Sequence, residues 1–94
     1  MEKLQFYIDA SLFTTRREAH QVMKEAFAGY EYYGNSLDAL RDVLTSIRQE
    51  AEITVTGLPS AREQIGAYTD RLLLVFRDAA EDNPHLTFLF PEDA

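Results

Sequence analysis

The sequence predicts a small α/β domain, in which a small three-stranded parallel sheet packs with helices in the order β-α-α-β-α-β. Two observations lead to this fold class. Three short segments have the apolar patterns of strands, and helical stretches of ten or more residues separate them. Parallel strands need crossover connections of about that length. The 94 residues have room for a single core, so we expect one domain over residues 1–94.

The first predicted strand and helix occupy the N-terminal third of the chain. Apolar side chains alternate with others over residues 4–8, which is typical of a strand. Thr15 and Glu18 match a capping box that starts a helix, and Gly29 is placed to end it. His20 has no second histidine at ligand spacing, so we expect a surface or half-buried structural residue rather than a metal ligand. The inner face of this helix is expected to carry Ala19, Val22, Met23, Ala26 and Phe27.

A turn and a short helix are predicted in the middle of the chain. Gly34 and Asn35 favour a sharp turn, and Ser36 is a suitable N-cap. Apolar residues then recur at three- and four-residue spacing, which indicates a buried stripe. This stripe is Leu37, Leu40, Leu44 and Ile47. The opposite face is expected to carry Asp38, Asp42, Thr45 and Gln49.

The C-terminal half is predicted to hold a strand, one long helix and a last strand. Ile53 and Val55 alternate with threonines, as in a strand. Ser60 and Glu63 match a capping box, and the helix is expected to run from there to Asn83. Its apolar side carries Ile65, Tyr68, Leu72, Val75, Phe76 and Ala79. Residues 86–90 are almost continuously apolar, which predicts a strand covered on both faces.

The composition narrows the classes of partner. A net charge of −7 argues against nucleic-acid binding and favours basic partners, although acidity that only keeps the domain soluble is an alternative. No apolar run approaches the roughly 20 residues of a membrane helix, and the N-terminus lacks a signal-peptide pattern. The absence of cysteine fits a reducing compartment. We therefore expect a cytoplasmic protein that binds neither nucleic acid nor membrane.

Residues 32–44, YYGNSLDALRDVL, resemble the barstar family of intracellular inhibitors of secreted bacterial ribonucleases. The family pattern is approximately Tyr-Tyr-Gly-x-Asn-Leu-Asp-Ala-Leu-(Trp)-Asp-x-Leu. Ser36 stands where the family usually has Asn, and Arg41 stands where it has an aromatic residue. Residues 74–80 also resemble the family's last helix. The resemblance agrees with the predicted fold and implies a non-enzymatic inhibitor of a basic ribonuclease, expected to be a monomer when free.

The resemblance also implies which residues meet the partner. Carboxylates on a helix can enter a ribonuclease site that is lined with basic side chains and substitute there for phosphate. Asp38 and Asp42 would be the central anions, with Asp42 as the hot spot, and Asp78 would add a second acidic contact. Tyr32 would touch the partner while Tyr33 packs. The full set of implied partner-binding residues is Tyr32, Gly34, Ser36, Asp38, Ala39, Asp42, Thr45 and Asp78.

Other interpretations of the same residues remain open. Acidic residues early in a helix also complement the helix dipole. Asp38 and Asp42 have the spacing to hold a divalent ion or to act as acid and base, but no catalytic motif accompanies them. We therefore expect no enzyme, no catalytic residue, no metal and no cofactor. Arg41 would weaken attraction to a basic enzyme unless it pairs with Asp38 or Glu31. It leaves open a barstar-like regulatory module with a non-ribonuclease partner.

Overall fold

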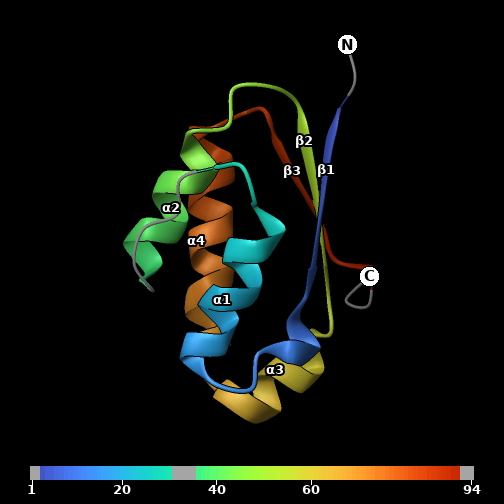
Figure 1. The fold of residues 1–94 in the computed structure, drawn as a ribbon, viewed down its shortest axis with the longest axis vertical. Coiled ribbons are helices and arrows are strands. Elements are labelled where there is room, and N and C mark those ends of the chain that lie inside the picture. Colours follow the sequence, from blue (N-terminus) through green and yellow to red (C-terminus); the bar gives the residue numbers. More distant parts are fainter. Residues whose placement is uncertain (1–2, 31–35, 92–94) are drawn as a thin grey trace.

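The computed structural model describes residues 3–30 and 36–91 and confirms the predicted fold class. Figure 1 shows a three-stranded sheet with α1, α2 and α4 standing together on one side of it. The elements are β1 (Leu4–Asp9), the one-turn 3-10 helix η1 (Ala10–Leu12), α1 (Arg16–Ala26), α2 (Leu37–Thr45), β2 (Ala51–Thr56), α3 (Leu58–Ile65), α4 (Tyr68–Asp82) and β3 (Leu86–Leu89). Among the described residues, no helix is long and apolar enough to cross a membrane.

The sheet has the order β1-β2-β3, and both pairings are parallel. Phe6 lies beside Ile53, and Ile53 lies beside Phe88. One row of apolar side chains therefore extends across all three strands, on the face of the sheet that the helices cover. The expectation that residues 86–90 are covered on both faces is wrong. Because β2 takes the centre, β3 is an edge strand, and Thr87 and Leu89 are exposed on the side away from the helices.

The predicted start of the first helix is confirmed. Thr15 is the N-cap of α1, and its hydroxyl oxygen accepts a hydrogen bond of 3.0 Å from the Glu18 amide. The inner side of this helix packs on the sheet, where the rings of Phe27 and Phe6 lie 5.0 Å apart between centres. Ala19, Met23 and Phe27 are buried as expected, and Val22 and Ala26 are partly buried.

The single long helix that the sequence predicts between β2 and β3 is two helices in the structure. Gly66 adopts a φ of 57°, which favours glycine, and separates α3 from α4. Ser60 is therefore not an N-cap but lies inside α3. The cap position belongs to Gly57, whose φ is 77° and where a Cβ would come within 2.4 Å of the Ser11 backbone nitrogen. The apolar periodicity continues across both helices, and this hid the break.

His20 is more deeply buried than the sequence predicted, and only 1% of the residue is exposed. Its Nε2 atom lies 2.6 Å from the hydroxyl oxygen of Tyr68, and the two rings meet edge to face. The guanidinium of Arg16 covers the Tyr68 ring at 4.8 Å from its centre. Burial lowers the pKa of His20 below its usual value, since a charged imidazole is disfavoured away from water.

Acidification from about pH 7.5 to about 5.5 should destabilise the protein through His20. The unfolded chain takes up the His20 proton at a higher pH than the folded chain does. The free energy of unfolding should therefore fall by up to about 1.4 kcal/mol per pH unit below about 6.5. Urea unfolding across this range measures the loss. His20→Gln should lack this component, and His85→Gln, a substitution at a half-exposed site, should retain it. Identical pH profiles for the wild type and His20→Gln would contradict the assignment.

Candidate partner-binding surface

The helix α2 presents one buried side and one acidic side, as the sequence predicted. The hydroxyl oxygen of Ser36 accepts a hydrogen bond of 3.1 Å from the Ala39 amide, which confirms Ser36 as the N-cap. The buried residues of this helix are Ala39, Leu40, Val43 and Leu44. The helix ends at Thr45, so Gln49 lies beyond it and does not extend its acidic side. Ile47 is buried as expected, although it too follows the helix.

Asp38 and Asp42 are both exposed on α2, and Asp78 is exposed on α4. Within residues 3–30 and 36–91, none of these three side chains forms a hydrogen bond or an ion pair. Their carboxylates therefore face water with their full acceptor capacity. A surface of this kind can receive guanidinium or ammonium groups from another molecule.

Arg41 pairs with Asp82 of α4 and not with Asp38, one of the two partners that the sequence suggested; the other, Glu31, lies outside the described residues. The pair links the two helices, and both side chains remain partly exposed, at 40% and 55%. This contact draws the one cationic side chain of α2 toward α4. The positive charge of Arg41 is offset by Asp82, while the acidic residues of α2 keep theirs.

The helices α2 and α4 run side by side in the same direction (Figure 1). Arg41, in the middle of α2, meets Asp82 at the C-terminal end of α4, and the turn after α2 meets Asn83 just beyond α4. Asp78 lies one helical turn before Asp82 on α4, and Leu37 lies one turn before Arg41 on α2. Asp78 is therefore at the level of the first turn of α2, which also carries Asp38.

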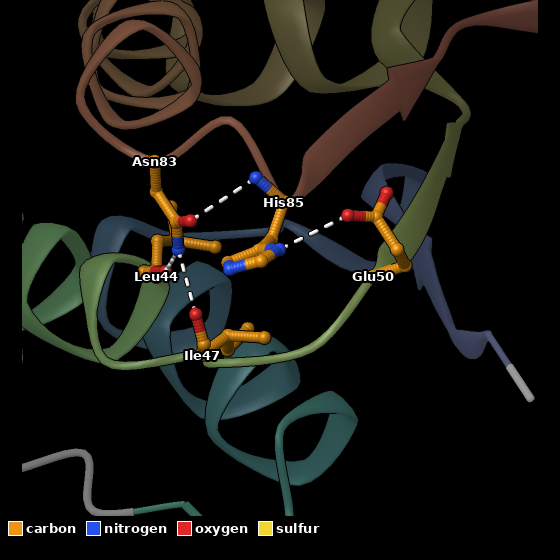
Figure 2. A network of polar contacts seen from close by, with 5 residues as sticks. All are labelled: Leu44, Ile47, Glu50, Asn83 and His85. Atoms are coloured by element: carbon orange, nitrogen blue, oxygen red, sulfur yellow. Dashed lines mark hydrogen bonds and ion pairs between the residues drawn. The ribbon is translucent and has the colours of Figure 1, made fainter. Parts of the chain in front are cut away.

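Asn83 holds the end of α2 in place (Figure 2). Its side-chain amide nitrogen donates to the carbonyl oxygens of Leu44 at 3.0 Å and Ile47 at 2.9 Å. Its side-chain oxygen accepts from the His85 amide at 3.2 Å, and only 6% of the residue is exposed. Nδ1 of His85 in turn lies 3.0 Å from Oε1 of Glu50, just before β2. One buried side chain therefore connects α2 to the turn between α4 and β3.

The remaining implied contact residues differ in how much they offer a partner. Ser36 is exposed, while Ala39 is only 9% exposed and presents little side-chain area. Thr45 is half-exposed, but its hydroxyl donates to the Arg41 carbonyl at 2.9 Å. Tyr32 and Gly34 lie outside the described residues. The roles of Asp82 and Asn83 could not be predicted from the sequence, because they depend on the contact between α2 and α4.

A model of the family described as Barstar (barnase inhibitor) matches residues 4–90 of the chain. The chain belongs to this family. A search among curated proteins gave no significant match. The Barstar match extends from β1 to just beyond β3, so it covers every described helix and strand.

Members of the Barstar family are non-enzymatic inhibitors, and the family description names barnase as the enzyme that is inhibited. Membership therefore suggests a ribonuclease inhibitor and implies a barnase-like ribonuclease as the partner. The exposed acids of α2 are compatible with this class of partner, because nucleases that hold RNA are basic.

Replacing Asn83 by Ala should destabilise the fold by about 2–3 kcal/mol, because two buried carbonyl groups lose their donor. Urea unfolding followed by circular dichroism measures this change. Gln49→Ala is a matched control at an exposed site, and it should shift stability by no more than about 0.5 kcal/mol. If Asn83→Ala were as stable as Gln49→Ala, the hydrogen bonds of Asn83 would not support α2.

Proposed function

We propose that this Barstar-family protein inhibits a basic, barnase-like ribonuclease by placing α2 and the segment before it in the active site. Asp38 and Asp42 substitute for phosphate oxygens, with Asp42 as the main anchor. Asp78 adds an acidic contact from α4. The segment before α2 contributes Tyr32 and Gly34, and the helix itself contributes Ser36, Ala39 and Thr45. The protein acts in the cytoplasm and without catalysis.

The observation that supports this proposal best is that the carboxylates of Asp38 and Asp42 on α2 are available to a partner. Both carboxylates are exposed and without a partner in the described part of the chain, while Arg41 is held by Asp82. A decoy for phosphate needs anions that are free to accept hydrogen bonds from Arg and Lys. Acids that were already engaged within the molecule would have to break those contacts first.

The charge of the chain supports the same partner class. A net charge of −7 attracts a basic enzyme over distances comparable to the Debye length, about 10 Å at 0.1 M salt. Association with such an enzyme should accelerate at low ionic strength. Titration of a basic microbial ribonuclease with the protein should abolish RNA cleavage at a one-to-one ratio, and the association rate constant should fall steeply as salt rises.

Asp42→Ala should weaken inhibition by at least about 2 kcal/mol, or about thirtyfold in Kd, as expected for a central charged residue. Inhibition titrations against a basic microbial ribonuclease measure the change. Glu63→Ala on α3 removes the same charge from an exposed site distant in sequence, and it should alter Kd little. Equal effects of the two substitutions would show that net charge matters but that α2 is not the contact surface.

Arg41 and Asp82 offer a test of local charge, because substitution of either residue breaks the same ion pair. Arg41→Ala leaves the acid unpaired and should raise the association rate constant severalfold at low salt. Asp82→Ala leaves the cation unpaired and should lower it. Stopped-flow kinetics measures both. Stability should change by no more than about 1 kcal/mol in each, since the pair is exposed. Rate changes of the same sign would contradict the proposed role of local charge.

A further inference from the structure

An apolar groove lies between α4 and β3. It does not include Asp38, Asp42 or Asp78, which together are called the acidic surface below. It has a volume of about 770 Å³ and is lined by Leu73, Phe76, Arg77, Ala80, Glu81, Phe88 and Phe90. The rings of Phe76 and Phe88 stack at 4.9 Å between centres, and those of Phe88 and Phe90 at 6.3 Å. Aromatic side chains that remain partly exposed in a groove are typical of an interaction surface.

The groove borders β3, whose outer edge no other strand covers in the described part of the sheet. The Ala51 amide donates to the His85 carbonyl, so alternate residues of β3 direct their peptide groups toward β2. The peptide groups of Phe88 accordingly point outward. Natural edge strands are usually protected by charged residues, but residues 86–90 carry none, in a chain that is 27% charged. The outer edge of β3 is therefore open to another strand at Phe88, while the Leu86 amide already donates to the Asn83 carbonyl at 3.1 Å.

The groove is bordered by one basic and one acidic side chain, and such a pair can match the same pair on a second copy of the chain related by a two-fold axis. Arg77 and Glu81 stand one turn apart on α4, and both are about 70% exposed, at 73% and 68%. In a two-fold pair of copies, Arg77 of one copy can face Glu81 of the other, and the same contact is made twice. A foreign peptide would need its own matching acid and base at this spacing. The charge pattern thus favours a second copy of this chain.

The same charges set the register of such a pair. Ala79 is the midpoint between Arg77 and Glu81, and it lies three residues, or about 4.5 Å, beyond Phe76 along α4. Phe76 stacks on Phe88, and β3 runs opposite to α4 with a rise of about 3.3 Å per residue. The two-fold axis that brings Arg77 opposite Glu81 therefore passes near Thr87.

We propose that two copies of this chain pair through the outer edges of β3, antiparallel and centred on Thr87. The pairing joins the two sheets into one and merges the two grooves into a single apolar seam. The Phe88 amide of each copy donates to the Leu86 carbonyl of the other. Because α2 packs on another side of α4, the acidic surface stays outside this seam. The free monomer expected from the sequence is then in equilibrium with a dimer at high protein concentration.

The pairing should strengthen with salt, because each copy carries a net charge of −7 and screening reduces their repulsion. Sedimentation equilibrium of the wild-type protein at about 0.05 M and about 0.5 M NaCl should show a monomer–dimer equilibrium with the tighter constant at high salt. Asp42→Ala should still dimerise, which separates this proposal from the inhibitory one. A protein that is monomeric at millimolar concentration in both buffers would overturn the proposal.

A single introduced cysteine tests the register, since the chain contains no cysteine of its own. Thr87→Cys should form a disulfide-linked dimer under mild oxidation, because the two residues lie opposite each other at the axis. Thr54→Cys is the matched control. It lies on the same face of the sheet but in the central strand, and it should stay monomeric. Equal cross-linking of the two variants would overturn the β3 pairing.

Charge reversal tests the contact itself. Arg77→Glu and Glu81→Arg should each weaken dimerisation at least fivefold, because each puts like charges opposite each other. An equimolar mixture of the two variants should recover dimers, since the charges of the two copies then match. The intramolecular pair between Arg77 and Glu81 stays broken in that mixture, so recovery would report the contact between copies. Failure of the mixture to dimerise would overturn the contact.

Discussion

The buried amide of Asn83 is the constraint on which the arrangement of this molecule depends. It reaches from the turn after α4 to two carbonyl groups at the end of α2, and its oxygen fixes the start of β3 through His85. A buried amide that satisfies three backbone groups allows few alternative positions for the segments it joins. This contact, together with the burial of Leu40, Val43 and Leu44, sets the direction in which α2 presents its acids.

The second constraint is electrostatic. It depends on where the charged side chains of α2 point rather than on how many there are. The acids of α2 project into water, while the cation on the same helix is used against α4. The exposed ion pair between Arg41 and Asp82 adds little to stability. Its effect is to keep a positive charge beside an acid, so that the surface offered to a basic enzyme remains negative.

Local patterns in the sequence predicted most of the elements but not the contacts between them. Thr15 and Ser36 were recognisable as caps because capping depends on residues three positions apart. Gly66 was missed because apolar spacing continues past it, and β3 was expected to be covered because an apolar run does not reveal which strand is central. Asp42 came from a resemblance in sequence, whereas Asp82 and Asn83 required the packing of α2 on α4, which involves residues about forty positions apart.

The helix α4 serves both proposed surfaces, and the small size of the domain explains why. The helices α1, α2 and α4 cover one side of the sheet, and no strand in the described part of the chain pairs with the outer edge of β3. One side of α4 then meets α2 and carries Asp78 and Asp82, while another borders the groove with Arg77 and Glu81. The first surface attracts a basic protein and is weakened by salt, but the second brings together two acidic copies and is strengthened by it. Ionic strength therefore favours the two associations in opposite directions, although both depend on the same helix.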